Sequence, residues 1–356
     1  MEQRRRLRIL SKIPEAGDTA TFVLEPADGL PLHYRPGQYL TLLFQSNGQE
    51  KRRAYSFSTC PGVDALPAIT VKRVVNGEFS NYLLRHVQAG DLLEAIDPNG
   101  LFLLPEKQVD TLFFIAAGSG ITPVFSQLKM LLQSRENAHR NTKIVLYYAN
   151  RDSQSTIFKA QIDRWIAEYP ARFKCIYFFS REKNVEHALS RHLNNELLEQ
   201  LLLAYFQEKI TPRQRRSTWF YLCAPTALMR MARMTLRTLD FPDEHIRQET
   251  FLPDTRLPDR IIDTSKMHTI LAQGKNERIE FQTYEGETIL NAALRQGIAL
   301  PYTCKSGVCF TCLAKCTAGE VEVAFVDSTR REGPGSMVNT CIGYAVSERV
   351  ELVYSV

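Results

Sequence analysis

Cysteine spacing near the carboxyl-terminal end constrains this chain more than any other feature of its sequence. The 356 residues contain eight cysteines, and five of them lie between positions 304 and 341. A cytoplasmic chain has little use for structural disulfides, so a cluster of this kind indicates a metal or redox site. The five are Cys304, Cys309, Cys312, Cys316 and Cys341.

Four of these cysteines have the spacing of cluster ligands. Cys304-x4-Cys309-x2-Cys312, with Cys341 downstream, is typical of the four thiolates that bind a plant-type [2Fe–2S] cluster. Zinc sites usually pair one C-x2-C with a second, so a zinc site and unbound core thiols are the weaker alternatives. Cys316 falls outside the pattern, and we expect it to be a buried, small apolar residue.

Composition and charge exclude several classes of protein. Hydrophobic residues make up 44% and charged residues 23% of the chain, as in soluble globular proteins. A net charge of +5 is too small to indicate a nucleic-acid binder. No apolar run approaches the ~18 residues of a membrane span, and Arg8 and Lys12 interrupt any signal peptide. We therefore expect a cytoplasmic protein with neither nucleic acid nor membrane as a partner.

The hydrophobic pattern predicts a multidomain protein with β, α/β and α+β parts. Residues 1–105 contain short strand-like segments and one helix, which predicts a small antiparallel β-barrel. Residues 106–253 alternate strands and helices, as in a doubly wound parallel sheet. Residues 254–266 are polar and read as a linker. Residues 267–356 form a third unit with 10 acidic and 8 basic residues, mildly acidic against a basic body.

Individual elements are predicted as follows. Strands of the first domain are expected at Thr21–Leu24, Tyr39–Phe44, Arg53–Ser58 and Ile69–Val74, with a helix at Phe79–His86. The second domain has expected strands at Thr111–Ala117, Lys143–Tyr148, Lys174–Phe179 and Trp219–Cys223, and helices at Pro123–Gln133, Ile157–Ile166 and Leu228–Leu239. The third has strands at Met267–Ala272 and Ile279–Gln282 and a helix at Thr288–Gln296. The polar segment Asn184–Ser217 is predicted to be a solvated surface excursion.

A glycine turn directly follows the expected strand at Thr111–Ala117. It reads Gly118-Ser119-Gly120-Ile121-Thr122-Pro123. Glycines let the backbone approach a pyrophosphate, and the following helix amino terminus favours the anion. Thr122 can cap that helix and Pro123 suits its first position. A plain strand-to-helix turn remains the alternative.

A second pair of short motifs lies in the barrel region. Arg53-Ala54-Tyr55-Ser56 is followed, after another strand, by Gly77-Glu78-Phe79-Ser80. An arginine suits a pyrophosphate, a tyrosine can lie against a planar ring, and a serine can donate a hydrogen bond. On residue chemistry alone, a plain strand and turn is the simpler interpretation.

In this order the motifs resemble the ferredoxin–NADP reductase family over residues 1–255, while residues 267–356 resemble a plant-type ferredoxin domain of β-grasp-like fold. The resemblance implies an FAD-binding barrel, an NAD(P)H-binding sheet and a [2Fe–2S] domain. It also rests on Pro36–Tyr39, on Cys223-Ala224-Pro225 and on Glu249-x-Phe251. Without it, Cys223 could equally be a core residue that ends a strand.

The resemblance implies roles for individual residues. Arg53 and Ser80 would hold the FAD pyrophosphate, Tyr55 would flank the isoalloxazine, and Ser56 would approach its N5. The implied catalytic residues are Ser56, Cys223 and Glu249. The implied cofactor-binding residues are Arg53, Ala54, Tyr55, Ser56, Gly77, Phe79, Ser80, Gly118, Gly120, Thr122, Ser180, Arg181 and Cys223, and the implied metal ligands are Cys304, Cys309, Cys312 and Cys341.

The three-domain order is similar to the reductase components of multicomponent bacterial oxygenases. Within that group, Phe79–Tyr82 and Ser180–Glu182 resemble the reductase subunits of phenylacetyl-CoA epoxidases. The resemblance implies an oxidoreductase that passes electrons from NAD(P)H through FAD and [2Fe–2S] to an oxygenase, docked on the acidic third unit. A reductase of a Rieske or other hydroxylase and a non-catalytic electron-carrier or sensor module are the alternatives.

The nucleotide preference is a separate question. Arg151 stands after the second strand of the sheet, and Ser180 and Arg181 after the third. These residues could bind a 2′-phosphate and favour NADPH. Asp152 and Glu182 lie beside them, and either could bind a ribose hydroxyl, which leaves NADH open.

Overall fold

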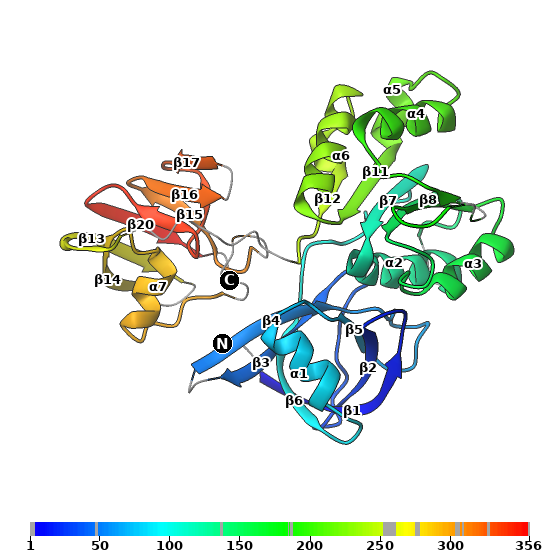
Figure 1. Cartoon of the computed structure of the whole chain (residues 1–356). Coiled ribbons are helices and arrows are strands. Elements are labelled where there is room, and N and C mark those ends of the chain that lie inside the picture. Colours follow the sequence, from blue (N-terminus) through cyan, green and yellow to red (C-terminus); the bar gives the residue numbers. More distant parts are fainter. Residues whose placement is uncertain are drawn as a thin grey trace. The chain divides into compact units, whose positions relative to one another are not determined.

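The computed structural model describes residues 4–46, 49–135, 138–183, 185, 188–251, 261–274, 278–302, 307, 310–325 and 328–354. Its contacts divide the chain into two compact units, Met1–Phe251 and Leu252–Val356. Figure 1 shows both, coloured along the sequence. Two predicted cluster ligands, Cys304 and Cys309, lie outside the described residues.

The first part of unit one is a six-stranded antiparallel barrel, which confirms the prediction. Its strand order is β4-β3-β6-β1-β2-β5, and an isolated antiparallel bridge between Phe57 and Ile69 joins the two edges. Helix α1 (Glu78–His86) buries Phe79 and Leu83 in the barrel core. The strands are β1 (Arg4–Pro14), β2 (Thr19–Pro26), β3 (Tyr39–Ser46), β4 (Gln49–Ser56), β5 (Ala68–Lys72) and β6 (Leu92–Asn99).

Strand β1 is absent from the sequence-based prediction. Leu7 and Ile9 alternate with exposed residues, as in a half-buried strand, but Arg5 takes a buried position in the same row. The Arg5 guanidinium lies 3.2 Å from the Asp28 carboxylate and donates to the Leu30 carbonyl at 2.7 Å. These contacts satisfy the buried charge, so the arginine can occupy a core-facing position.

The second part of unit one is a parallel sheet with helices on both faces, as predicted. Its order is β10-β9-β8-β7-β11-β12. Along β7, Phe114 joins a core that includes α2, whereas its neighbour Phe113 joins one that includes α4 and α6. The strands are β7 (Thr111–Ala117), β8 (Lys143–Asn150), β9 (Phe173–Phe179), β10 (Ala188–Leu189), β11 (Thr218–Cys223) and β12 (Ile246–Gln248). The helices are α2 (Ile121–Gln133), α3 (Lys159–Glu168), α4 (Asn195–Tyr205), α5 (Pro212–Ser217) and α6 (Thr226–Thr238).

The prediction for Asn184–Ser217 is wrong: much of the segment is helical and packed. In α4, Leu198 and Leu202 are fully buried in the core that also contains residues of α6. Asn194 caps the helix, because its Oδ1 accepts the Leu197 N–H at 2.9 Å. The polar residues on either side of this apolar stretch concealed it in the sequence.

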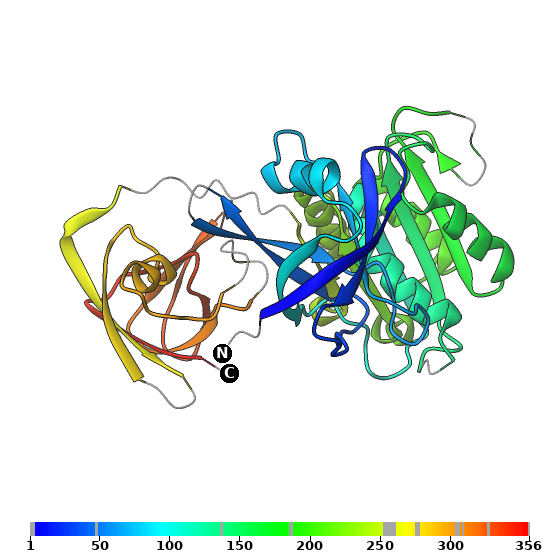
Figure 2. The ribbon, with the colours of Figure 1, turned by 90° about the horizontal axis from the view of Figure 1, so that it is seen from below.

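Unit two has a five-stranded mixed sheet, a three-stranded antiparallel sheet of order β17-β16-β19 and, in its described part, one helix, in agreement with the predicted β-grasp-like fold. Its main sheet has the order β14-β13-β20-β15-β18, in which only the β13–β20 pair is parallel. Helix α7 (Ile289–Arg295) buries Ile289 and Leu290 in the unit's core, and Figure 2 shows the strands curving around it. The strands are β13 (Asp263–Gln273), β14 (Arg278–Glu285), β15 (Leu313–Ala318), β16 (Val321–Phe325), β17 (Ser328–Glu332), β18 (Met337–Asn339), β19 (Gly343–Ala345) and β20 (Arg349–Val353).

Strand β13 begins earlier than the sequence predicts. Residues 263–266, assigned to the linker, belong to the strand: Asp263 pairs with Glu285, and the register then shifts before Met267 pairs with Tyr284. This end of the strand is mostly exposed, so its composition is polar and resembles a loop. Residues 254–260 of the predicted linker lie outside the described part. No helix in the described part is long and apolar enough to cross a membrane.

Candidate functional site

The two barrel motifs predicted to bind a flavin lie together. Arg53, on β4, places its guanidinium carbon 4.8 Å from the ring centre of Phe79 at the start of α1. The Ser80 hydroxyl accepts the Val74 N–H at 3.1 Å and donates to the Gly77 carbonyl at 3.4 Å. These contacts order the turn before α1 beside an exposed arginine. The arrangement provides a cation and a helix amino terminus for a phosphate group.

Ser56 ends β4 with its side chain buried. Ser56 is 3% exposed, and its Oγ has no hydrogen-bond partner among the described residues. Buried hydroxyls are normally hydrogen-bonded, so this atom fits a site that a ligand's polar atom completes. Tyr55 beside it packs partly buried against the barrel core, and burial raises its pKa. A hydroxyl and a flat aromatic ring at one strand end suit a planar heterocycle such as the flavin.

The predicted nucleotide turn lies at the carboxyl end of β7. Gly118–Gly120 forms a 3₁₀ turn, and Gly118 has a φ of +53°, which favours glycine. Helix α2 begins at Ile121 rather than at Pro123, with Gly120 as its capping residue. The predicted capping role of Thr122 is therefore wrong. Its hydroxyl donates to the Ser119 carbonyl at 2.9 Å and stabilises the turn from inside the helix.

Close packing leaves no room for a side chain at position 120 of this turn. A Cβ at this position would lie 1.8 Å from the Cys223 carbonyl oxygen. The turn is therefore packed directly against the end of β11, where Cys223 is 1% exposed. At Gly118, which is not fully buried, the absence of a side chain would let a pyrophosphate approach the backbone of the turn closely.

Cys223 and Glu249 lie close enough to interact. The Glu249 N–H donates to the Leu222 carbonyl at 3.0 Å, which places the glutamate beside the end of β11. Burial, followed by the nearby Glu249 charge, raises the pKa of the Cys223 thiol. Burial raises the pKa of Glu249 from 4.5 to about 8. Burial therefore favours the uncharged forms of both the thiol and the carboxyl group at this corner.

One residue of this region was not predicted from the sequence. Lys72 ends β5 of the barrel, and its Nζ lies 3.4 Å from where a Cβ on Gly118 would stand. Burial and the charge of Arg151 lower the pKa of Lys72. The lysine thus brings a cation from the barrel to the nucleotide turn. Its only signal in the sequence is a basic residue at the end of an apolar strand.

The loops after β8 and β9 lie side by side at the same edge of the sheet. Ser180 donates its N–H to the Asn150 carbonyl at 3.2 Å, and Arg181 donates its N–H to the Arg151 carbonyl at 2.9 Å. Glu182 accepts hydrogen bonds from Ser153, at 2.5 Å from the backbone nitrogen and 2.9 Å from the hydroxyl.

Asp152 is similarly engaged, because its Oδ1 accepts the Ser155 N–H at 2.8 Å. These contacts, with the charges of Arg151 and Arg181, lower the pKa of Asp152. Both acidic residues that could bind a ribose hydroxyl therefore already accept hydrogen bonds, Asp152 from Ser155 in its own loop and Glu182 from Ser153 in the neighbouring loop.

Half of the predicted cluster ligands can be located. Cys312 and Cys341 are buried in unit two, at 1% and 5% exposure. The Gly307 N–H donates to the Cys341 sulfur at 3.2 Å, and the Asn339 Nδ2 donates to the Gly307 carbonyl at 2.8 Å. An N–H aimed at a cysteine sulfur fits a thiolate ligand, whose charge it stabilises.

Cys316 behaves as predicted for a residue outside the ligand pattern. It is fully buried in β15, and its thiol lies 3.5 Å from the carbonyl oxygens of Ala318 and Gly319. The Cys316 thiol therefore makes its contacts within β15 and the turn that follows it.

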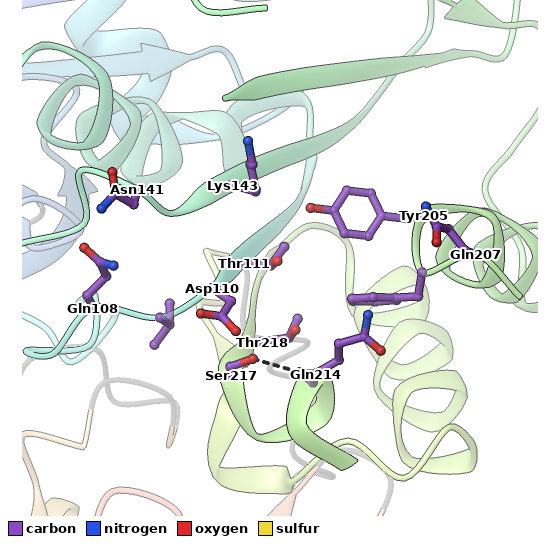
Figure 3. Close-up of a pocket in the computed structure, with 12 residues that line it drawn as sticks. Gln108, Asp110, Thr111, Asn141, Lys143, Tyr205, Gln207, Gln214, Ser217 and Thr218 are labelled. Atoms are coloured by element: carbon purple, nitrogen blue, oxygen red, sulfur yellow. Dashed lines mark hydrogen bonds between the residues drawn. The ribbon is translucent and has the colours of Figure 1, made fainter. Parts of the chain in front are cut away.

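A cavity of about 500 Å³ lies at the opposite edge of the parallel sheet. Thr111, Lys143 and Thr218 line it and are the first residues of β7, β8 and β11 (Figure 3). The strands are parallel, so their amino ends lie across the sheet from the Gly118–Gly120 turn. In open α/β sheets nucleotides bind at the carboxyl ends, and this cavity is therefore separate from the nucleotide site.

Comparison with known proteins assigns all three domains. The chain matches family models for an oxidoreductase FAD-binding domain at residues 6–103, an oxidoreductase NAD-binding domain at 114–234 and a 2Fe-2S iron-sulfur cluster binding domain at 272–346. The cofactors predicted from the sequence, FAD, a nicotinamide nucleotide and [2Fe–2S], are confirmed at this level. The motif residues quoted above lie within the matched segments, except Glu249 and Phe251, which lie between the second and the third.

Relatives of known function span most of the chain. It is 33% identical to a subunit of the 1,2-phenylacetyl-CoA epoxidase of Escherichia coli, over 85% of this chain and 83% of that protein. It is 29% identical to the ferredoxin reductase component of 3-ketosteroid-9-alpha-monooxygenase from Rhodococcus rhodochrous, over 90% and 88%.

A solved structure has the same fold over nearly the whole length. Phthalate dioxygenase reductase superposes with a TM-score of 0.59 at 23% identity, covering 98% of this chain and 97% of that one. Domain models, relatives and fold agree, and the resemblance drawn from the sequence motifs is confirmed. The chain belongs to the family of oxygenase reductase components, oxidoreductases that carry FAD-, NAD- and [2Fe–2S]-binding domains in one polypeptide.

Proposed function

We propose that this protein takes electrons from NAD(P)H and passes them through FAD and a [2Fe–2S] cluster to an oxygenase component in the cytoplasm. The observation that carries the proposal is the presence of three cofactor domains in one chain. When bound, the nicotinamide supplies a hydride, the flavin exchanges one or two electrons, and the cluster exchanges one. The order of domains then gives the order of electron flow.

The flavin would be held by residues at the edge of the barrel. Arg53 and Ser80, with the backbone at Gly77 and Phe79, would bind its pyrophosphate, because a cation and a helix start meet there. Ala54 and Tyr55 would position the ring. The buried Ser56 hydroxyl would hydrogen-bond to N5, since it has no partner among the described residues.

The nucleotide would lie at the carboxyl ends of the parallel strands. The Gly118–Gly120 turn and Thr122 would receive its pyrophosphate, and Lys72 would add a positive charge. Cys223 and Glu249 would lie by the nicotinamide, where two uncharged polar groups can orient the ring without opposing the positive charge it gains. Since Asp152 and Glu182 already accept hydrogen bonds from Ser155 and Ser153, Arg151, Ser180 and Arg181 would favour NADPH.

The cluster would be bound by Cys304, Cys309, Cys312 and Cys341. The Gly307 N–H would stabilise the Cys341 thiolate. The acceptor would dock on unit two, whose residues from 267 onward include 10 acidic and 8 basic ones. A phenylacetyl-CoA epoxidase type of oxygenase is the first candidate, since the relative with that name is 33% identical over most of the chain.

A pair of electron acceptors tests the proposed path. Ferricyanide can take electrons from the flavin directly, whereas cytochrome c and the native oxygenase should require the cluster. Full-length Cys312→Ser, and a chain truncated after Phe251, should keep the ferricyanide activity and lose the cytochrome c activity. If either variant reduced the oxygenase at the full rate, unit two would not lie on the electron path. Lack of any NAD(P)H oxidation by the full chain would instead favour a carrier or sensor module.

The oxygenase itself can be identified by co-purification from the native host. A di-iron partner would support the epoxidase assignment, whereas a Rieske or haem partner would assign the protein to another hydroxylase system.

A further inference from the structure

Helix α2 connects the nucleotide side of unit one to its flavin side. It begins directly after the Gly118–Gly120 turn and makes hydrogen bonds to residues of the barrel part of the unit. Ser126 Oγ donates to the Thr59 carbonyl at 2.5 Å, and Gln127 Nε2 donates to the Phe102 carbonyl at 2.5 Å; both side chains are fully buried. A Cβ on Gly37 would come within 2.0 Å of that same Phe102 oxygen. Close packing therefore leaves α2 little freedom to slide along the barrel.

Lys129, farther along α2, supplies the charge at this contact. Its Nζ lies 2.7 Å from Asp64 Oδ1, and the two side chains are 15% and 24% exposed. The other carboxylate oxygen, Oδ2, accepts the Cys60 N–H at 2.7 Å. A charged pair that is largely removed from water and also bonded to the backbone is held in one geometry. Lys129 thereby fixes the loop that carries Asp64.

That loop is a direct continuation of the strand that carries Ser56. Phe57 follows Ser56, and the Tyr34 ring stacks on Phe57 with centroids 3.9 Å apart. The Tyr34 hydroxyl lies 2.7 Å from Thr59 Oγ1. The loop is thus fixed from inside the barrel by aromatic packing, and from the other domain by Ser126 and Lys129.

A second barrel carboxylate, that of Glu15, interacts electrostatically with Lys129. Burial raises the pKa of Glu15, while a hydrogen bond from Thr21, at 2.7 Å, and the charge of Lys129 lower it. Glu15 follows β1 and Asp64 follows β4, so Lys129 interacts with two separate loops of the barrel. A neutral residue at position 129 would remove the cation from both.

We propose that Lys129 is a positioning residue for hydride transfer. Its ion pair with Asp64 sets the position of the nucleotide side of the unit, at Gly120 and Cys223, relative to the Ser56 end of β4. The inference rests on the proposed function. Lys129 would touch no reacting atom and would act through the position of the two domains. Misplacing reacting groups by ~1 Å can cost ~100-fold in rate, so the effect should fall on the rate at saturating nucleotide rather than on binding.

The test uses the full-length flavoprotein and the variants Lys129→Met and Lys129→Arg. In stopped-flow experiments, Lys129→Met should lower the limiting rate of flavin reduction by about tenfold or more, with FAD content and the Kd for NADPH changed less than about twofold. Lys129→Arg, which keeps the positive charge, should restore most of that rate. Arg237→Met, which removes an exposed ion pair with Asp243, is the matched control and should react like wild type.

Hydrogen exchange gives a readout that does not depend on turnover. The Cys60 amide is bonded to Asp64, so residues 57–64 should exchange faster in Lys129→Met than in wild type. If Lys129→Met does not fold, Ser126→Ala, which removes the neighbouring hydrogen bond to Thr59, should lower the limiting rate in the same direction.

Three outcomes would overturn the inference: a wild-type limiting rate in Lys129→Met, a loss confined to the Kd for NADPH, or unchanged exchange at residues 57–64. If the wild-type chain itself failed to reduce its flavin with NAD(P)H, the proposed function would fail, and this is a distinct result.

Discussion

A Cβ on Gly120 would stand 1.8 Å from the carbonyl oxygen of Cys223. The two residues belong to different elements, the turn before α2 and the end of β11. Their contact joins the phosphate side of the nucleotide site to the side where we place the nicotinamide. Because a backbone oxygen cannot move aside as a flexible side chain can, the contact permits only glycine.

Gly120→Ala should therefore disturb both fold and nucleotide binding. Overpacking of this kind costs about 1–3 kcal/mol of stability, and displacement of the turn should raise KM for NAD(P)H. Thermal unfolding and steady-state kinetics measure the two effects. Gly333→Ala is the control, since a Cβ there meets no atom within 4 Å. An unchanged Tm and KM in Gly120→Ala would contradict the observed packing.

Ser56→Ala should slow hydride transfer far more than it weakens FAD binding. The Ser56 hydroxyl is buried without a partner among the described residues, so its hydrogen bond is available for the flavin. Losing one positioned donor at a reacting centre costs up to about 2.7–4 kcal/mol of barrier, or 100–1000-fold in rate. Stopped-flow reduction measures the rate, and flavin absorbance measures FAD content. Normal reduction in the variant would show that Ser56 has another role.

Glu249 should make the stability of the nucleotide-free protein depend on pH. Its pKa is about 8 in the folded chain against an ordinary value of 4.5. Between these values the folded state keeps a proton that the unfolded state has lost, so its stabilising contribution is complete below pH 4.5 and is lost as the pH rises to about 8. Between pH 4.5 and about 8, the Tm of the wild type should fall relative to the Tm of Glu249→Gln. Above this range, the two curves of Tm against pH should run parallel. Parallel curves throughout would mean that Glu249 is ionised at pH 7.

In the parallel sheet the four central strands could be predicted from the sequence, whereas the short edge strands β10 and β12 could not. In the barrel β2 to β5 could be predicted, whereas β1 and β6 could not. Strand β7 has the predicted bounds because it is apolar along its length and buried on both faces. Strand β1 was missed because the buried Arg5 is satisfied by Asp28 and Leu30, partners that only the tertiary structure reveals.

The same distinction applies to the candidate site. Motifs indicated Ser56, Cys223 and Glu249, whereas Lys72 acts from a different domain than the turn it approaches. No local pattern shows that β5 brings this lysine to Gly118. Contacts between domains depend on the packing of whole elements, and they are therefore the part of a site that a single sequence reveals least.

The cysteines of unit two offer a matched pair of substitutions. Cys312→Ser should abolish the iron–sulfur absorption, since losing one of four thiolates normally costs the cluster. Cys316→Ala should keep it, because the Cys316 thiol is fully buried and bonded within β15 and its turn. Visible spectroscopy and iron content distinguish the two. Loss of the cluster in both variants, at an unchanged Tm for Cys316→Ala, would make Cys316 a ligand.

Arg181→Ala should affect NADPH and not NADH. If Arg181 binds the 2′-phosphate, kcat/KM for NADPH should fall by about tenfold or more, since a charge-assisted hydrogen bond contributes roughly 1.5–3 kcal/mol. The value for NADH should stay within about twofold, because NADH lacks that phosphate. A clear preference of the wild-type protein for NADH would reject the assignment.

The position of β20 has a consequence for the biosynthesis of the protein. This strand, Arg349–Val353, lies in the middle of its sheet, between β13 and β15. The core around Cys312 and Cys341 therefore cannot close until Val353 has left the ribosome. The barrel, by contrast, has all its strands once Asn99 has emerged. Flavin can thus be acquired during translation, whereas iron and sulfide must be inserted late, when the earlier domains have already folded.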